Sequence, residues 1–152
     1  MKLGELNLGN SVMLDEVCAN KKVVFLGVPG AFTPGCSKTH LPGFVAKADE
    51  IKAKGVHEIL CVATDNAAVM DAWGKDQKAE GKVRMLADPQ GELCKALGLG
   101  LDVGVLRVGP SFKRFSAIAE NGVFTAVNVE PEAAPTGLTC SLAEPLITQL
   151  LK

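Results

Sequence analysis

The strongest constraint on the fold of this chain is a short apolar run at residues 23–28, followed at once by Pro-Gly-Ala-Phe-Thr-Pro-Gly-Cys at residues 29–36. A short run this apolar, bounded by proline and glycine, predicts a strand buried on both faces. Cys36 then falls at the start of a new helix, where unpaired N–H groups and the helix dipole favour a thiolate over a thiol. The pattern therefore predicts a reactive cysteine on a strand–turn–helix unit.

Alternating strand and helix patterns occupy the rest of the chain. Strands are predicted at 58–64, 83–86, 114–119 and 122–129, and helices at 42–54, 67–78, from the 88–91 turn to about 97, and at 143–150. Asp65 and Asn66 are candidate caps of the second helix, and Asn121-Gly122 predicts a type I′ hairpin turn. The order β-α-β-α-β, then a hairpin, then a helix predicts an α/β protein of thioredoxin-like fold, with a central mixed sheet flanked by helices.

The size and charge of the chain are those of one ordinary globular domain, here residues 1–152. The chain has 47% hydrophobic residues and a net charge of −1, with no basic run for nucleic acid and no apolar stretch long enough to span a membrane. No targeting signal is visible, so we expect a cytoplasmic protein, or a mitochondrial one whose leader has been removed. The five cysteines are widely spaced without a Cys-x-x-Cys pair, which favours free thiols in a reducing compartment.

An ordered series of motifs resembles one protein family. Residues 27–44, GVPGAFTPGCSKTHLPGF, contain Pro-x-x-x-Thr-x-x-Cys and resemble the active site of the type-5, atypical two-cysteine peroxiredoxins. Later stretches resemble that family in the same order: AWGK at 72–75, LADP at 86–89, KRFS at 113–116, NVEP at 128–131 and TGLTCSL at 136–142. The resemblance covers residues 21–150. The family usually has a longer N-terminal hairpin, so the chain is predicted to be abbreviated before Lys21.

The resemblance implies a thiol peroxidase that reduces hydrogen peroxide and alkyl hydroperoxides and needs no cofactor or metal. Cys36 would be the peroxidatic nucleophile, oxidised to a sulfenic acid. A helix terminus stabilises a negative charge such as a thiolate by at most about 2 kcal/mol, so the Cys36 thiolate also needs a nearby cation. Arg114 matches the family's active-site arginine and would supply it. Thr33 would donate to the thiolate, accept from the peroxide, or cap the helix, and Pro29 would shield the sulfur.

A second cysteine would complete the cycle. The resemblance implies that Cys140, in a loop before the last helix, resolves the sulfenic acid as an intramolecular disulfide. Cys61 is the competitor, although its place within a predicted strand suits a core residue. Cys18 and Cys94 are expected to be spectators, and His40 is expected to have a local packing or hydrogen-bonding role.

Partners and alternatives follow from the same motifs. Thioredoxin or glutaredoxin is the implied reductant, and the family implies a homodimer. A thiol–disulfide oxidoreductase would need Cys-x-x-Cys, and Thr33 stands where its first cysteine would be. A non-enzymatic redox sensor or interaction module that signals through oxidised Cys36 stays open as the alternative.

Overall fold

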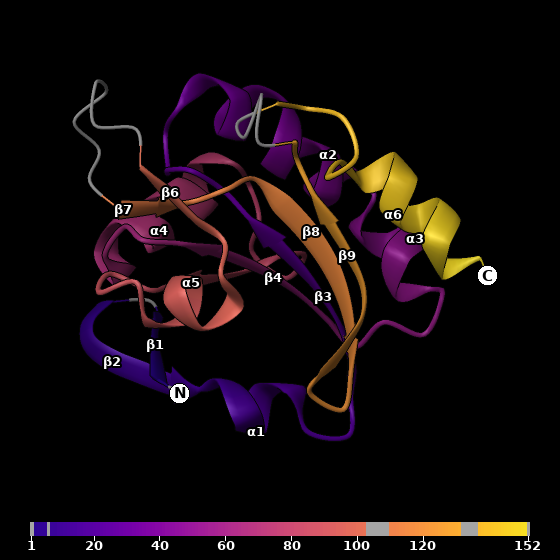
Figure 1. Cartoon of the computed structure of the whole chain (residues 1–152), viewed down its shortest axis with the longest axis horizontal. Coiled ribbons are helices and arrows are strands. Elements are labelled where there is room, and N and C mark those ends of the chain that lie inside the picture. The colour runs from indigo at the N-terminus through magenta and orange to yellow at the C-terminus, as the bar shows by residue number, and fades with distance from the viewer. Residues whose placement is uncertain (1, 6, 103–109, 132–136, 152) are drawn as a thin grey trace.

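A central sheet with helices on both faces organises the molecule (Figure 1). The computed structural model describes residues 2–5, 7–102, 110–131 and 137–151. Over these residues the main sheet has the strand order β2-β1-β5-β4-β3-β8-β9. Its strands are β1 (Lys2–Glu5), β2 (Asn7–Met13), β3 (Lys22–Gly27), β4 (Glu58–Ala63), β5 (Arg84–Ala87), β8 (Phe115–Glu120) and β9 (Val123–Val129). Strands β3, β4 and β5 run parallel, whereas β8 and β9 are antiparallel to their neighbours. The predicted mixed sheet is confirmed.

Side chains of the central strands alternate between two apolar clusters, as the period of a strand requires. On β3, Val24 and Leu26 belong to one cluster and Val23 and Phe25 to the other. The first cluster packs against α2 (Leu41–Ala46), α3 (Ala48–Lys52), α4 (Ala67–Asp76) and α6 (Ala143–Leu150), and the second against α1 (Leu14–Cys18) and α5 (Glu92–Leu97). Burial on both faces explains why the strand run contains no polar position.

A glycine lets the sheet close beside the site. Gly27 lies opposite Phe115 in the antiparallel pairing of β3 with β8. A Cβ at Gly27 would lie 2.0 Å from Cε1 of Phe115, so the Phe115 ring occupies the space that any side chain there would need. The end of β3 is thereby packed directly against the start of β8.

The predicted helix at 42–54 differs from the observed one at its start and in its middle. The chain turns helical before Cys36 and forms a π-helix, η1 (Cys36–His40), in which the Leu41 N–H donates to the Cys36 carbonyl. Pro42 follows, and because proline has no N–H to donate into the preceding turn, a regular α pattern cannot pass through it. Lys47, with φ of −101° and ψ of 7°, then divides α2 from α3, although its N–H still donates to the Gly43 carbonyl. Gly55, with φ of +90°, ends the segment as predicted.

The N-terminal segment also differs from the prediction. Residues before Lys21 form the β1–β2 hairpin and α1, and β1 joins the main sheet where Gly4 pairs with Ala87 of β5. A second, two-stranded sheet of β6 (Gly100–Asp102) and β7 (Pro110–Phe112) was likewise not predicted. Each of these two strands has only three residues and lacks a strong apolar alternation, so local pattern does not reveal them.

The other predicted elements are present with shifts of one or two residues. Asn121 and Gly122 have φ of +48° and +79°, as the predicted hairpin turn requires. Helix α6 is tied to β9 by a reciprocal amide pair between Asn128 and Gln149, with N···O distances of 2.8 and 2.7 Å. None of the described helices combines the length and apolar character needed to cross a membrane.

Candidate active site

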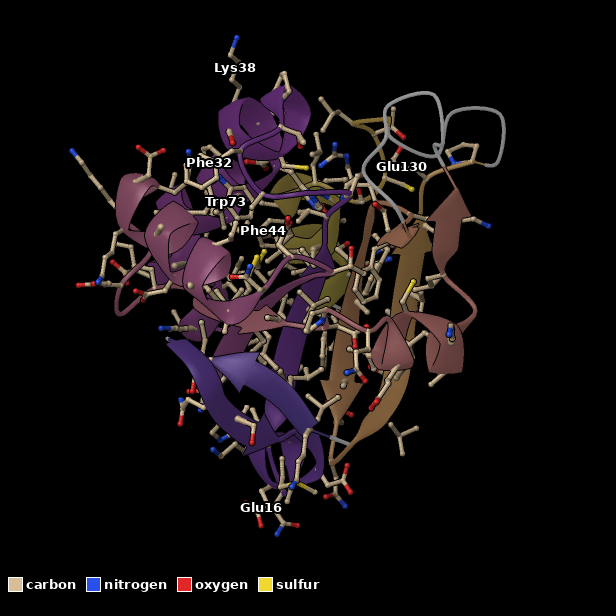
Figure 2. All side chains as sticks on the ribbon, turned by 90° about the vertical axis from the view of Figure 1, so that its left-hand side faces the viewer. Glu16, Phe32, Lys38, Phe44, Trp73 and Glu130 are labelled. Carbon is tan, nitrogen blue, oxygen red and sulfur yellow. The ribbon has the colours of Figure 1, made fainter. Side chains whose placement is uncertain are left out.

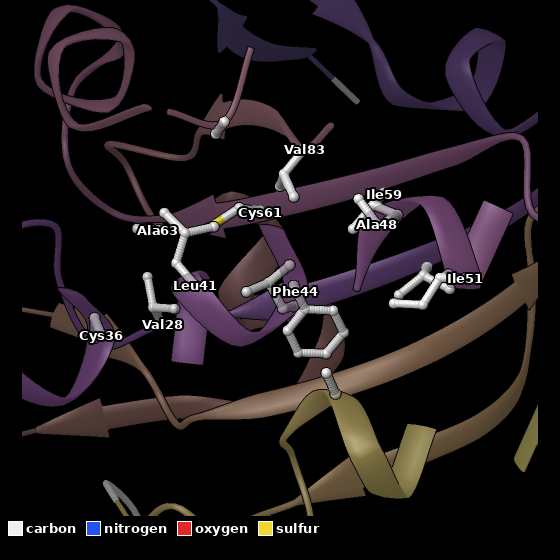
Figure 3. Packing of buried hydrophobic residues seen from close by; sticks show 14 of the residues in the cluster. Val28, Cys36, Leu41, Phe44, Ala48, Ile51, Ile59, Cys61, Ala63 and Val83 are labelled. Atoms are coloured by element: carbon white, nitrogen blue, oxygen red, sulfur yellow. The ribbon is translucent and has the colours of Figure 1, made fainter. Parts of the chain in front are cut away.

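Cys36 lies in the turn that follows β3, at the first position of η1, and it is fully buried. Figure 3 shows it beside Val28 at one end of the apolar cluster. Ser37, which follows Cys36, is held by helix α4, because the Trp73 indole N–H donates to the Ser37 hydroxyl at 2.9 Å. The Phe32 ring lies 6.4 Å from the Trp73 ring and is 54% exposed, so these aromatic side chains border the turn at one end of the molecule (Figure 2).

Arg114 brings a buried positive charge to the Cys36 sulfur. Its backbone lies between β7 and β8, and its side chain is 3% exposed, with Nη1 donating to Cys36 Sγ at 3.4 Å. Gly35 makes this approach possible, because a Cβ there would lie 2.9 Å from Arg114 Nη2. Since arginine stays protonated, a full positive charge faces the Cys36 sulfur.

His40 extends the network on the other side of the guanidinium. Its Nδ1 lies 3.1 Å from Arg114 Nη1, and its Nε2 lies 2.9 Å from the Ser141 carbonyl oxygen. Burial and the Arg114 charge lower the pKa of His40 to about 3, so the ring is neutral. Because arginine only donates, Nδ1 accepts from it and the Nε2 hydrogen is donated to Ser141. The predicted hydrogen-bonding role of His40 therefore connects the active-site helix to the loop that contains Cys140.

Cys140 is half-buried in that loop, and a neighbouring carboxylate fixes the residues on both sides of it. Glu130 is 2% exposed and accepts from the backbone N–H groups of Thr139 and Ser141 at 3.0 and 2.9 Å. It also accepts from both hydroxyls of these residues. Although burial opposes ionisation, these hydrogen bonds lower the pKa of Glu130 to about 2. The Cys140 thiol donates to the Val129 carbonyl at 3.3 Å.

The turn before Cys36 holds the other two predicted site residues. Pro29 directly follows the buried Val28, and Thr33 donates its hydroxyl hydrogen to the Gly30 carbonyl at 2.7 Å. The Thr33 hydroxyl thus points into its own turn, and its backbone carbonyl accepts from the Ser37 N–H at 2.9 Å. Asp65 anchors the same turn by accepting from the Ala31 N–H, whereas Asn66 alone caps α4.

The remaining cysteines lie in apolar surroundings. Cys61 is fully buried in β4, opposite Leu26, and Figure 3 shows it in the same cluster as Cys36. Burial, with a further contribution from the nearby Cys36, raises the pKa of Cys61 well above the usual range of a thiol. Cys18 and Cys94 are buried in the opposite cluster, and burial raises their pKa values as well. All five cysteines are free.

One cavity of the molecule lies away from Cys36 and Arg114. It has a volume of about 390 Å³ and is lined by residues at the beginnings of β4 and β5, among them Glu58 and Arg84. Arg84 is paired there with Glu5 and Glu58. Cys36 lies past the carboxyl end of β3, where ligands of parallel sheets usually bind. Among the described residues, no group of three His, Cys, Asp or Glu side chains could hold a metal ion.

A buried cysteine that faces an arginine, on the strand–turn–helix unit of a mixed sheet, defines a thiol-based redox protein. The family model described as Redoxin matches residues 3–142, and the chain therefore belongs to the redoxin family. Peroxiredoxin-2C of Arabidopsis thaliana is 41% identical over 140 residues, which cover 92% of this chain and 85% of the relative. Reduced Prx3 of Vibrio vulnificus in complex with hydrogen peroxide superposes with a TM-score of 0.90 at 42% identity, covering 98% and 92% of the two chains. Peroxiredoxin 5 of Alvinella pompejana gives 0.87 at 28%, covering 99% and 92%.

These relatives confirm the thioredoxin-like peroxiredoxin fold and support thiol peroxidase activity in general. The structure brings Cys36 and Arg114 into contact and leaves Cys140 in a separate, hydrogen-bonded loop. Sequence reasoning did not find the roles of Glu130 and Gly35. The Asn-Val-Glu-Pro motif contains Glu130, but its buried carboxylate is recognised only once the 139–141 segment is placed against it.

Proposed function

We propose that this protein is a peroxidase in which Cys36 reduces hydrogen peroxide and small alkyl hydroperoxides. The observation that carries this proposal is the 3.4 Å contact between Arg114 Nη1 and Cys36 Sγ at the start of a helix. Complete burial of Cys36 favours a small oxidant over a bulky one. The peroxiredoxin relatives support the same reaction class.

The first chemical step is attack of the Cys36 thiolate on one peroxide oxygen. An S–O bond forms, the O–O bond breaks, and the leaving oxygen takes up a proton to depart as water or an alcohol. Arg114 stabilises the negative charge that moves onto that oxygen. Thr33 donates its own hydrogen to Gly30, so its oxygen keeps lone pairs that can accept the hydrogen bond of the hydroperoxide O–H.

Cys140 is the resolving cysteine that we propose, with thioredoxin or glutaredoxin reducing the resulting disulfide. Its half-buried position in a loop supports this role, because a loop can bring its sulfur to Cys36, whereas Cys61 lies within a central strand. An intramolecular disulfide of this kind would place the protein in the type-5 subfamily. All five cysteines are free thiols, which supports a location in a reducing compartment. We propose that this compartment is the cytoplasm.

Peroxide consumption with thioredoxin and its reductase tests this cycle on wild type and single Cys→Ser variants. Cys36→Ser should lose essentially all turnover, and Cys140→Ser should consume one equivalent of peroxide and then stop. Cys94→Ser is the matched control and should turn over like wild type. Retained turnover in Cys36→Ser would contradict the assignment of Cys36 as the nucleophile. A Cys36–Cys61 bridge in peptide maps of the oxidised protein would reject Cys140 as the resolving residue.

A further inference from the structure

The loop around Cys140 is held closed by one buried carboxylate. Glu130 follows directly on β9, and its backbone N–H donates to the Arg114 carbonyl at 3.1 Å, so the residue is attached to the strand pair that bears the active-site arginine. Its side chain then accepts hydrogen bonds from residues 139 and 141. The labelled Glu130 lies at the same end of the molecule as Phe32 and Trp73 (Figure 2).

Cys140 sits between the two residues that Glu130 holds, and its own thiol is engaged in hydrogen bonds that do not involve Cys36. The Cys140 Sγ donates to the Val129 carbonyl at 3.3 Å and lies 3.7 Å from Glu130 Oε2, whereas Cys36 Sγ is in contact with Arg114. A disulfide between the two sulfurs therefore requires Cys140 to leave its hydrogen bonds. Since the Glu130 bonds fix both neighbours of Cys140, they must be broken or distorted in the same movement.

A further hydrogen bond connects this closed loop to the end of the molecule that contains Cys36. The Ser141 carbonyl accepts from His40 Nε2, and His40 Nδ1 accepts from Arg114. The loop is thereby fixed against the same guanidinium that faces the Cys36 sulfur. A change in this contact on oxidation of Cys36 can reach the loop through one side chain.

We propose that Glu130 is a positioning residue for disulfide formation: it holds the Cys140 loop closed while Cys36 reacts, and its release governs the rate of the second step. This inference rests on the proposed function, because it takes Cys140 as the resolving cysteine. In that step the Cys140 sulfur attacks the sulfur of the Cys36 sulfenic acid, the S–O bond breaks, the thiol proton joins the leaving hydroxide, and one disulfide and one water result.

Two consequences distinguish such a residue from one that only maintains the fold. A closed loop delays disulfide formation, so a second peroxide has time to oxidise the sulfenic acid to a sulfinic acid. The same bonds stabilise the reduced form over the disulfide form and so raise the reduction potential of the pair. Weakening them should accelerate resolution, protect Cys36 from sulfinic acid formation and lower the potential.

Glu130→Gln tests the proposal in the full-length protein, because the amide has the same shape but presents N–H groups to donors. Loss of one charge-assisted hydrogen bond changes an equilibrium by about tenfold or more. We expect Cys140 in the reduced variant to be alkylated by iodoacetamide about tenfold faster, as measured by mass spectrometry. Disulfide formation should accelerate about tenfold, while sulfenic acid formation stays within about twofold of wild type. The potential should fall by about 30 mV for a tenfold change in the equilibrium constant.

Glu120→Gln is the matched control, because it removes the same charge from the far end of the same hairpin, where Glu120 pairs with Lys22. It should leave all four readouts unchanged. Ser141→Ala keeps the carboxylate but deletes one donor, so it should shift the readouts in the same direction by less, and it serves if Glu130→Gln does not fold.

The outcomes separate this inference from the proposed function. Unchanged Cys140 alkylation and unchanged or slower disulfide formation in Glu130→Gln overturn the role of Glu130 and leave the peroxidase intact. If wild type forms no Cys36–Cys140 bridge, the proposed resolution step and the role of Glu130 are both rejected. If Cys140 is still alkylated faster in Glu130→Gln although wild type forms no bridge, the Glu130 carboxylate only restrains the loop.

Discussion

At the scale of single residues, Arg114 contacts both the Cys36 sulfur and a neutral imidazole. His40 lies 3.1 Å from the same Nη1 atom, and its pKa of about 3 means that it carries no competing charge at physiological pH. Its Nδ1 therefore accepts a hydrogen bond and orients the guanidinium instead of repelling it. Arg114 is thus positioned by the buried His40 imidazole, which stays neutral at physiological pH.

Replacing Arg114 should slow the reaction of Cys36 with peroxide by roughly 10²–10³, the effect typical of removing one preorganised charge-stabilising donor. Arg114→Ala removes both the charge and the fork. Arg114→Lys keeps the charge without the fork and should lose less, which separates the two contributions. Stopped-flow measurement of the second-order rate, with the fluorescence of Trp73 as signal, gives the values. A rate for Arg114→Ala within about twofold of wild type would contradict this assignment.

Glu130 should make the stability of the reduced protein depend on pH in the acid range. Its pKa is lowered to about 2 by four hydrogen bonds, against about 4.3 in an unfolded chain. Because the folded-state pKa is the lower one, this contribution is fully present above about pH 5 and is lost as pH falls towards 2. Wild type should therefore exceed Glu130→Gln by at most about 3 kcal/mol at neutral pH, and urea unfolding should show the difference fading in acid. A difference that does not vary with pH would contradict the ionised, hydrogen-bonded state of Glu130.

At the scale of elements, the π-helix η1 and the glycine before it adapt the helix start to the site. Cys36 and His40 are both on the buried side of this turn and both contact Arg114. The apolar period alone indicated a helix from Pro42, whereas the strand–turn–helix pattern placed Cys36 at a helix start, and η1 agrees with the second prediction. The turn that carries the chemistry is the one that departs from regular geometry.

Gly35→Ala should displace the guanidinium and slow the peroxide reaction about tenfold, because the new Cβ would lie 2.9 Å from Arg114 Nη2. Gly43→Ala is the matched control within α2, where the nearest atom to a new Cβ is 3.9 Å away. That variant should react like wild type and gain slight helix stability. Stopped-flow rates and thermal unfolding on both variants test the pair. Equal rates for Gly35→Ala and wild type would show that the arginine tolerates the displacement.

At the scale of the whole molecule, we expect a homodimer, as the peroxiredoxin resemblance implies. The exposed large apolar side chains include Phe32 and Val123, at 54% and 66%, and association would cover surface of this kind. Light scattering on the reduced protein at tens of micromolar should give twice the mass of one chain. A monomer at that concentration would contradict the prediction, and repeating the measurement after oxidation shows whether association depends on the redox state.

The parts of the fold that could be predicted are those whose signals are local. The apolar runs of β3 and β4, the caps and turns at Asn66 and Asn121, and the strand–turn–helix context of Cys36 are all contained in short windows of sequence. The N-terminal hairpin and the β6–β7 sheet were missed because their strands carry only a weak apolar alternation, and β1 also depends on its distant pairing with β5, where Gly4 lies opposite Ala87. Asp65 was assigned to the wrong partner for a related reason, since its carboxylate accepts from Ala31 across 34 positions.

The sequence by itself determined the class of chemistry, because its motifs already contain the reactive groups. These are the cysteine of Pro-x-x-x-Thr-x-x-Cys and the arginine of Lys-Arg-Phe-Ser. Only the tertiary structure decided how these groups act on one another. Arg114 meets Cys36 across 78 positions, and His40 meets Ser141 across 101. Contacts of that range depend on how the sheet pairs and on which groups are dehydrated together. Burial then keeps the His40 imidazole neutral, whereas hydrogen bonds from residues 139 and 141 keep the buried Glu130 carboxylate ionised.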